Sequence, residues 1–458
     1  MAQLNLPPQW LQTQLGDVVF YGKTQKCELS DVTNETWVLE LEDIEKESSR
    51  IISRKTASER PFKSTKNRFE RGNVLYGKLR PYLNKVVVAD TAGVCTTEII
   101  PLDSEPFVLN RYLFHWLRTR DFLNYVNEVS YGVNMPRLGT KDGVAAPFAL
   151  APLAEQKVIA DKLDTLLAQV DNTKARLERI PQILKHFRQS VLAEAVSGRL
   201  TEDWRTENDC SLGIDEYLDL IKDFNIKAKD LLEPTQEGNW LCCQLGHIMS
   251  VRSGEGLTSK NMVQEGGIPV YGGNGINGYH DHANTSQPAI VIGRVGFYCG
   301  SVHRTESKSW ITDNAMIVSF PTQLINIDFA YWLLKATNLR EDTASSAQPV
   351  ISGSKIYKIK ILLAPVKEQT EIVRRVDQLF AHADRIEQQV NNALARVNKL
   401  TQSILAKAFR GELTEQWRQD HPDLISGDNS AEALLQRIKA ERAAAAPVKR
   451  TRKAKRRG

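Results

Sequence analysis

Apolar residues recur at alternating spacings of four and three in two long stretches of this 458-residue chain. The first stretch places them at Ile159, Leu163, Leu166, Val170, Leu177, Ile180, Leu184, Phe187 and Val191, with Thr173 at the same spacing between Val170 and Leu177. The second follows the same rhythm at Ile372, Val376, Leu379, Ala383, Ile386, Val390, Ala393, Val397, Leu400 and Ile404. A mean spacing of about 3.5 residues is typical of a helix with one narrow apolar seam. We therefore predict two long amphipathic helices.

The two stretches are copies of one another. Pro152 and Pro365 lie 213 residues apart, and the same offset holds without a gap as far as Trp204 and Trp417. Such a match indicates an internal duplication. Two pseudo-symmetric copies that pair within one chain must run antiparallel, so we expect an antiparallel coiled coil. Packing of each helix on its own globular region alone remains an alternative.

The helix limits can be predicted from prolines and glycines. Pro152 and Pro365 disfavour helix in the residue before them and therefore place both starts just downstream. Gly198 and Gly411 are typical helix stops, which leaves about 40 residues per helix. Pro181 lies inside the first copy only, and there we expect a kink or a break.

A mixed, strand-rich region precedes each helix. The two regions begin alike, with "QWLQTQLGDV" from Gln9 and "NWLCCQLGHI" from Asn239, and then diverge. The duplication therefore kept a common scaffold in both copies, and the residues that this scaffold carries differ between the copies. We predict an α+β protein in which two strand-rich α/β domains are joined by the two long helices as a pseudo-two-fold repeat.

Residues 50–85 of the first region are strongly basic, with eleven Lys or Arg against two acids and with interleaved aromatic residues. Within it, "GNVLYGKLRPYLNKVVVAD" predicts a strand, a tight loop containing Gly77 and a second strand beginning near Val86. This density suits a face that contacts phosphates. A solvated charged surface remains the alternative. The candidate DNA-binding residues here are Arg71, Lys78, Arg80, Tyr82, Asn84 and Lys85.

The second region instead contains the glycine-rich "GGIPVYGGNGINGYHDH", followed by "AIVIGRVGFYCGSV". Glycine allows the backbone to approach a ligand closely, and the stretch lacks the lysine of a phosphate-binding P-loop. A purely structural turn cluster remains possible. Asn, Gln and Arg pair with base edges in the major groove. The candidates are Asn274, Asn277 and Arg294 here, and Asn134, Arg137, Gln348 and Ser352 in the loops before the helices.

Composition narrows the class of protein. The net charge is +5, but the last ten residues hold seven Lys or Arg and no acid, so the rest of the chain is slightly acidic. We expect a disordered basic tail and a DNA-binding surface only as a local patch. The six cysteines lack a zinc-type spacing, and no membrane span or signal peptide is evident. We expect a cytoplasmic protein without a metal or cofactor.

Motifs for catalysis on DNA are missing from the sequence. No Asn/Asp-Pro-Pro-aromatic loop suggests an amino-methyltransferase, and no Walker A loop suggests an ATP-driven translocase. Glu155-Gln156-Lys157 fits part of a nuclease pattern, but its counterpart ends in Thr370. We therefore predict a protein that binds and does not catalyse.

The repeated Pro-Leu/Val-x-Glu-Gln motif and the Gly-x-Leu-Thr-Glu-x-Trp-Arg ending resemble the specificity subunits of type I restriction-modification systems. "LYGKLRPYLNK" and "IPVYGGNGINGY" resemble segments of that family's target recognition domains. The resemblance covers essentially the whole chain before the basic tail.

This resemblance implies that each target recognition domain reads one half of a split sequence in double-stranded DNA, and that the helices hold the halves apart. It also implies two partner methyltransferase subunits that modify adenine and two ATP-dependent translocating restriction subunits. Methyltransferase docking would include Glu155, Gln156, Glu368 and Gln369 and the exposed surfaces of the helices. Capping of the helix N-termini by these four residues is an equal alternative.

On this basis we expect target recognition domains over residues 1–152 and 237–365. Conserved helical repeats of the family pattern would span 153–205 and 366–418. A helical linker would cover 206–236, a helical extension 419–446 and the basic tail 447–458. A standalone bipartite DNA-binding regulator and a coiled-coil tether without a DNA role are the competing functions.

Overall fold

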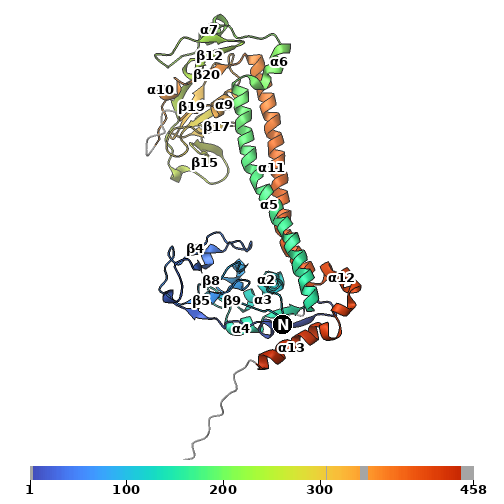
Figure 1. The fold of residues 1–458 in the computed structure, drawn as a ribbon. Helices are drawn as coiled ribbons and strands as arrows, with labels where there is room; N and C mark the ends of the chain where they lie inside the picture. The colour runs from blue at the N-terminus through green and yellow to red at the C-terminus, as the bar shows by residue number, and fades with distance from the viewer. Residues whose placement is uncertain (1–3, 306, 341–348, 445–458) are drawn as a thin grey trace, which may run out of the picture. The chain divides into compact units, whose positions relative to one another are not determined.

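The computed structural model describes residues 4–305, 307–340 and 349–444 (Figure 1). The chain divides into two compact units, the first formed by Met1–Leu177 with Ala393–Gly458 and the second by Glu178–Asn392. Gln348 and the basic tail 447–458 lie outside the described residues. Within the described part, no helix is both long enough and apolar enough to cross a membrane.

Both predicted long helices are present. They are α5 (Leu153–Val196) and α11 (Val366–Phe409), each of 44 residues. They begin directly after Pro152 and Pro365, and each is followed by a glycine with a left-handed backbone, Gly198 with φ of 80° and Gly411 with φ of 76°. The predicted starts and stops are therefore confirmed, because local backbone chemistry sets them.

The expected break at Pro181 is wrong, since α5 continues through this residue. Proline removes one backbone hydrogen bond and crowds the preceding turn. The remaining turns of the helix and its packed seam outweigh this local penalty. Pro181 is exposed.

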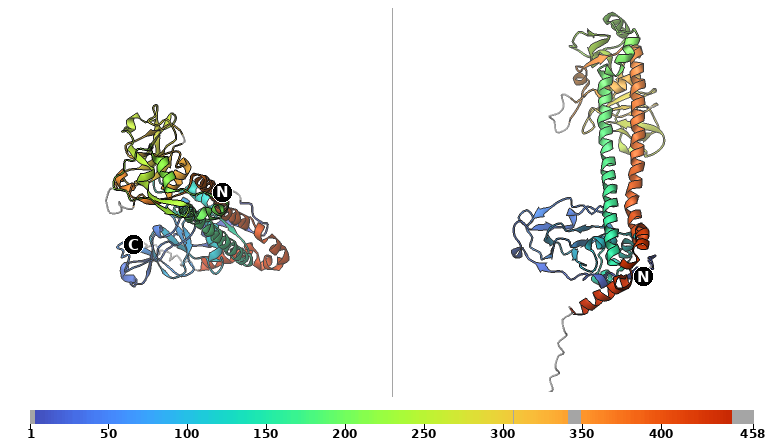
Figure 2. Two further views of the ribbon diagram at one scale, coloured as in Figure 1. Left: turned by 90° about the horizontal axis from the view of Figure 1, so that it is seen from above. Right: turned by 45° about the vertical axis from the view of Figure 1, so that its right-hand side comes forward.

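In each unit, one half of α5 lies beside one half of α11, and the halves run in opposite directions (Figures 1 and 2). In unit 1, Lys162 Nζ donates to the carbonyl of Leu413 at 2.7 Å. In unit 2, Arg188 contacts Asp384 at 2.6 Å and Glu387 at 2.9 Å. The predicted antiparallel pairing of the two helices is therefore confirmed within each unit.

Half of the predicted seam is buried, and most of the other half is partly buried. Ile159, Leu163, Ile372 and Val376 are fully buried. Thr173 and Leu400 are exposed, and Leu167 is buried where Leu166 was expected. The straight 3.6-residue turn of a helix drifts against a strict 3.5-residue pattern, so the buried face shifts by a residue along the stretch.

Unit 1 contains three sheets. They are β1–β10, β7–β6–β9 and β2–β5–β8–β3–β4. The strands are β1 (Leu11–Gln14), β2 (Lys26–Cys27), β3 (Trp37–Leu39), β4 (Lys55–Thr56), β5 (Lys66–Phe69), β6 (Val74–Gly77), β7 (Val86–Val88), β8 (Gly93–Cys95), β9 (Ile99–Leu102) and β10 (Pro147–Leu150). The shorter helices are α1 (Leu15–Val18), α2 (Asn110–Leu117), α3 (Arg120–Val129), α4 (Thr140–Ala145), α12 (Glu415–Asp420) and α13 (Ala431–Ala444).

Unit 2 also contains three sheets. They are β11–β12–β20, β13–β19–β16–β17 and β15–β14–β18. The strands are β11 (Thr235–Glu237), β12 (Trp240–Gln244), β13 (Ser250–Ser253), β14 (Ile268–Gly272), β15 (Gly275–His280), β16 (Ile290–Gly293), β17 (Val302–Arg304), β18 (Trp310–Ile311), β19 (Ala315–Ser319) and β20 (Lys360–Leu363). The shorter helices are α6 (Glu202–Glu207), α7 (Ile214–Ile221), α8 (Leu245–Ile248), α9 (Ile327–Ala336) and α10 (Gly353–Ile356).

The two units share part of their topology. In each, an antiparallel trio places one strand between two others, as β7–β6–β9 and as β17–β16–β19. Each also contains one parallel pair, β3 with β8 and β14 with β18. The sequence alignment of the two regions fails after about ten residues, yet the scaffold persists because the buried pattern of the strands is retained.

Both long helices contribute to the core of each unit. In unit 1, Ile159 and Leu163 of α5 share a core with Trp116, Phe148 and Phe409. In unit 2, a single core contains residues of both long helices, Val191 and Ala195 of α5 and Ile372 and Val376 of α11, together with Trp240. The helices therefore belong to the globular cores as well as to each other.

Candidate nucleic-acid interface

Acidic side chains outside the basic segment 50–85 neutralise much of it. The ion pairs are Arg50–Glu45, Arg54–Asp90, Arg60–Asp43 and Lys66–Glu40. Two further cations donate to main-chain carbonyls, Arg68 to Asp31 at 3.0 Å and Lys85 to Leu41 at 2.7 Å. The segment is therefore largely a folded, internally paired surface, and its excess charge is smaller than its composition indicates.

Five cations of this segment have no side-chain hydrogen bond or ion pair to any described residue. They are Lys55, Lys63, Arg71, Lys78 and Arg80. Arg71 and Arg80 are exposed, and Lys78 is half-buried. A cation that lacks an internal partner is available to a phosphate or a base edge. Lys85 is not, because burial lowers the pKa of its ammonium and its protons point at a carbonyl.

The predicted hairpin is present as β6, a short 3-10 turn η3 (Pro81–Leu83) and β7, but Gly77, which was expected in the loop, is the last residue of β6. Its second strand begins at Val86, as predicted. Arg80 and Asn84 flank the turn in left-handed conformations, with φ of 50° and 48°. Tyr82 projects from the turn and is 48% exposed, whereas Asn84 is buried.

The loop before α4 lies against this hairpin. Arg80 N donates to the carbonyl of Pro136 at 2.7 Å, and Leu138 N donates to the carbonyl of Lys78 at 3.0 Å. Asn134 is exposed on this loop, while Arg137 Nε contacts Glu98 Oε2 at 3.2 Å. One surface of unit 1 therefore contains Lys78, Arg80, Tyr82 and Asn134, although the two segments that carry them lie some 50 residues apart in the sequence.

In unit 2 the glycine-rich stretch forms a hairpin of β14 and β15. Asn274 and Asn277 are exposed on it. The carbonyl of Gly273 accepts from His303 Nε2 at 3.3 Å, and a β-carbon on Gly293 would lie 2.9 Å from that carbonyl. The glycines therefore permit a close approach between the two hairpins β14–β15 and β16–β17.

Arg294 and Ser352 also lie close together. Ile351 N donates to the carbonyl of Arg294 at 2.9 Å, which joins the β16–β17 hairpin to the segment before α10. Arg294 Nη1 lies 3.4 Å from Ser253 Oγ, and Ser352 is exposed at the start of α10. Arg294, Ser352 and the turn that contains Phe297 and Tyr298 therefore form one surface of unit 2.

The four residues expected at a docking face are instead buried. Glu155, Gln156, Glu368 and Gln369 are each 0% exposed. They therefore offer no surface to a partner in this structure. The side chain of each residue is hydrogen-bonded inside the protein. Many of these bonds join elements that are distant in the sequence.

Glu155 gathers three donors in unit 1. Its carboxylate accepts from Trp10 Nε1 at 2.8 Å, from Thr414 Oγ1 at 2.6 Å and from Arg418 Nη1 at 2.6 Å. Gln156 accepts from Leu109 N at 3.0 Å, at the start of α2. The pair joins the first strand region, α5 and the end of the second helical copy.

Glu368 repeats this arrangement in unit 2. Its carboxylate accepts from Trp240 Nε1 at 2.8 Å, from Thr201 Oγ1 at 2.7 Å and from Arg205 Nη2 at 2.8 Å. Gln369 accepts from Asn326 N at 2.8 Å, at the start of α9. The repeated motifs therefore form two equivalent buried polar clusters, one in each unit. Gln156 and Gln369 also donate to the carbonyls of Ala151 and Ala364, just before their own helices, at 2.9 Å and 2.8 Å.

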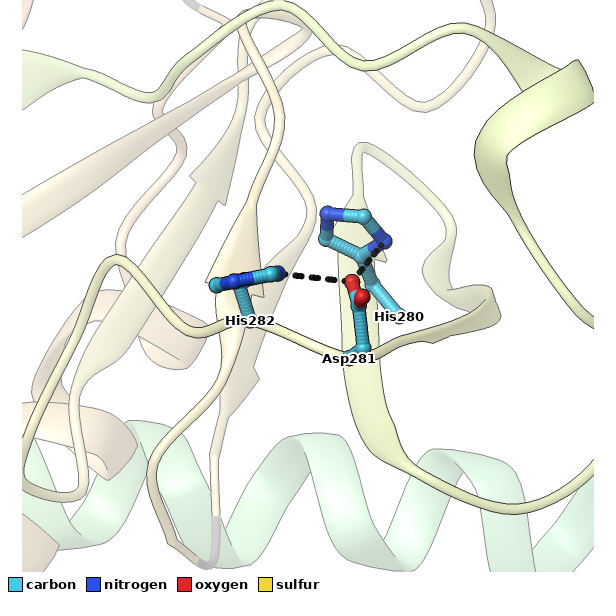
Figure 3. Close-up of side chains that lie close together, drawn as sticks. All are labelled: His280, Asp281 and His282. Carbon is cyan, nitrogen blue, oxygen red and sulfur yellow. Dashed lines mark hydrogen bonds and ion pairs between the residues drawn. The ribbon is translucent and has the colours of Figure 1, made fainter.

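One His/Asp group stands out among the described residues, at the end of β15 (Figure 3). Asp281 Oδ1 lies 2.7 Å from His282 Nδ1 and 3.0 Å from His280 Nδ1. The hydrogen bond from His282 holds the pKa of the Asp281 carboxyl below its usual value. These mutual contacts explain the group, and we assign no ion to it.

Sequence reasoning missed the exposed apolar side chains on both surfaces. Val133 is 99% exposed beside Asn134, and Phe297 is 83% exposed beside Tyr298. Phe297 and Tyr298 lie between glycines in "RVGFYCGS", a pattern that favours a turn with projecting side chains. Exposure itself depends on tertiary packing, so the pattern alone does not distinguish them from core residues.

Comparisons with known proteins agree with this architecture. The family described as "Type I restriction modification DNA specificity domain" matches residues 9–182 and 237–396. The type I restriction enzyme EcoKI specificity subunit of Escherichia coli (strain K12) is 41% identical over 379 residues, which cover 77% of this chain and 76% of that protein. The StySPI specificity subunit of Salmonella potsdam is 40% identical over 365 residues, covering 77% and 76%.

Solved structures share the fold. A chain from a structural study of complex assembly and conformational transition in the type I restriction-modification system superposes with a TM-score of 0.68 at 18% identity, covering 90% of this chain and 100% of that one. The HsdS subunit from Thermoanaerobacter tengcongensis gives a TM-score of 0.56 at 19% identity, covering 89% and 98%. The duplicated scaffold, the two divergent surfaces and these matches lead to one conclusion: the chain belongs to the family of DNA specificity subunits of type I restriction-modification systems.

Proposed function

We propose that each unit reads one half of a bipartite DNA site and that the paired helices set the spacing between the halves. The observation that carries this proposal is the repeated buried polar cluster of Glu155 and Glu368, which holds two different surfaces on equivalent scaffolds. A scaffold used twice with different exposed loops suits two different half-sites. The unpaired cations Lys78 and Arg80 support phosphate and base contact in unit 1.

Recognition and chemistry are divided between subunits in this proposal. Two methyltransferase subunits dock on the chain and modify adenine, and two ATP-dependent translocating subunits add restriction. The burial of Glu155, Gln156, Glu368 and Gln369 directs docking to other groups. Exposed polar side chains of α5 and α11, such as Lys185 and Lys399, are the available helix surface.

The test is a single-molecule methylome of cells that carry this chain with its neighbouring methyltransferase, compared with cells in which this chain alone is deleted. The expected result is a split motif with N6-methyladenine on both strands that disappears on deletion. An unchanged methylome despite active methyltransferase would contradict the proposal. It would favour a standalone DNA-binding regulator if the purified chain binds DNA, and a tether if it does not.

A further inference from the structure

The β6–β7 hairpin of unit 1 and the β16–β17 hairpin of unit 2 are the same structural element. In both hairpins, the last residue of the first strand donates its N–H to the carbonyl of the residue directly before the second strand. The number of residues between donor and acceptor is the same in both hairpins. The two sets of main-chain bonds are Gly77 N to Lys85 O at 2.9 Å with Leu83 N to Arg80 O at 2.9 Å, and Gly293 N to Ser301 O at 2.8 Å with Cys299 N to Gly296 O at 3.0 Å.

The segment before α4 in unit 1 and the segment before α10 in unit 2 brace the two hairpins in the same way. In unit 1 the bonds are Arg80 N to Pro136 O at 2.7 Å and Leu138 N to Lys78 O at 3.0 Å. In unit 2 they are Gly296 N to Pro349 O at 3.0 Å and Ile351 N to Arg294 O at 2.9 Å. The correspondence pairs Lys78 with Arg294, Arg80 with Gly296, Pro81 with Phe297, and Tyr82 with Tyr298.

Backbone conformation supports the same pairing. Arg80 and Asn84 are left-handed, and the equivalent residues of unit 2 are glycines with φ of 73° at Gly296 and 79° at Gly300. Glycine is the residue that this conformation favours, so a side chain at position 80 is kept against a local penalty. The Arg80 guanidinium has no hydrogen bond or ion pair to any described residue that would compensate. Strain of this kind clusters at functional sites.

The hairpin tips share one exposed side chain and differ in the others. Tyr82 and Tyr298 are similarly exposed, at 48% and 44%. Next to them, unit 1 presents the cation Arg80, and unit 2 presents Phe297, which is 83% exposed. The major groove of DNA admits a two-stranded β-ribbon.

Resting on the proposed function, we propose that these two hairpins enter the major groove and that their tips discriminate the half-sites. Arg80 pairs with the O6 and N7 atoms of a guanine, the commonest specific contact of arginine. Phe297 packs against the C5-methyl group of a thymine, since it has no polar atom with which to read a base edge. Tyr82 and Tyr298 each contact the DNA backbone in an equivalent way, and each contact positions its own hairpin tip.

The experiment uses the full chain with its methyltransferase partner, after the methylome has defined the motif. Absence of any motif would count against the proposed function and not against this assignment. Competition binding then compares DNA carrying 7-deazaguanine at each guanine, or deoxyuridine at each thymine, in either half-site. The variants are Arg80→Gly and Phe297→Ala. Arg80→Gly is suitable because glycine is the residue found at the equivalent position of unit 2, with the same backbone conformation.

We expect 7-deazaguanine at one position of one half-site to weaken binding of the native chain by roughly 10-fold. The same base change should have no effect on Arg80→Gly. Deoxyuridine at one position of the other half-site should weaken the native chain several-fold and leave Phe297→Ala unaffected. Each variant should keep full discrimination at the half-site read by its unaltered unit, which controls for misfolding.

Three results would overturn the assignment. The first is a motif in which neither half-site contains a guanine. The second is Arg80→Gly or Phe297→Ala remaining as sensitive to the modified base as the native chain. The third is loss of discrimination at both half-sites from either single substitution, which would indicate a general structural role.

Discussion

Removal of the Glu155 carboxylate tests whether the buried polar cluster holds unit 1 together. In Glu155→Ala, Trp10 Nε1, Thr414 Oγ1 and Arg418 lose their shared acceptor. Trp10 is 4% exposed, Thr414 is 0% exposed and the Arg418 side chain is 11% exposed, so water replaces the acceptor poorly. A buried neutral donor left without a partner costs about 1–3 kcal/mol, and breaking a buried ion pair costs about 3–5 kcal/mol.

These penalties overlap because one carboxylate serves all three donors. We therefore expect unit 1 to lose about 3–5 kcal/mol of its free energy of unfolding. Glu368→Ala should destabilise unit 2 in the same way but less, since the Arg205 side chain is 23% exposed and regains some hydration. The exposed equivalents Glu415→Ala and Glu202→Ala, in the first turns of α12 and α6, serve as matched controls and should cost under about 1 kcal/mol.

A chain with two compact units need not unfold in one step, so a single melting temperature is not a sufficient measure. Hydrogen exchange in a urea series, read peptide by peptide, separates the units. Protection should fall in residues 4–177 and 393–444 for Glu155→Ala, and within 178–392 for Glu368→Ala. A loss below about 1 kcal/mol in both variants, or equal loss in both units from either one, would refute the reasoning.

Three further predictions concern single residues. Arg80→Gly should raise the stability of unit 1 by up to about 1–2 kcal/mol because it relieves a left-handed backbone, and a lower urea midpoint than native would contradict this. Lys78→Ala should lower the salt dependence of DNA binding by about one phosphate contact, whereas Lys85→Met should leave it unchanged because Lys85 is held by the Leu41 carbonyl; equal slopes for both variants would remove the distinction. His115 should make unit 1 sensitive to acid: burial lowers its pKa despite the hydrogen bond to Asp164, so the folded state binds fewer protons than the unfolded state. The resulting stability is present above about pH 6.5, the usual pKa of unfolded histidine, and declines as the pH falls below it. Urea midpoints at pH 7.5 and 5.5 should converge in His115→Gln, and an unchanged pH dependence in that variant would exclude His115 as the cause.

The sequence by itself determined the features that depend on neighbours along the chain. Pro152, Pro365, Gly198 and Gly411 set the ends of both helices through backbone sterics, and the ungapped repeat established the duplicated scaffold. The second strand of the β6–β7 hairpin at Val86 followed from the local alternation of apolar and turn residues.

Only the tertiary structure decided the roles of charged and exposed groups. Glu155 was expected at a surface, and its partners Thr414 and Arg418 lie some 260 residues away in sequence. The basic segment is neutralised mainly by acids between Glu40 and Asp90 that do not neighbour their partners, and α5 continues through Pro181 against the local preference. The physical reason is common to all three: burial and pairing are set by contacts between distant elements, which outweigh the local preferences that a sequence displays.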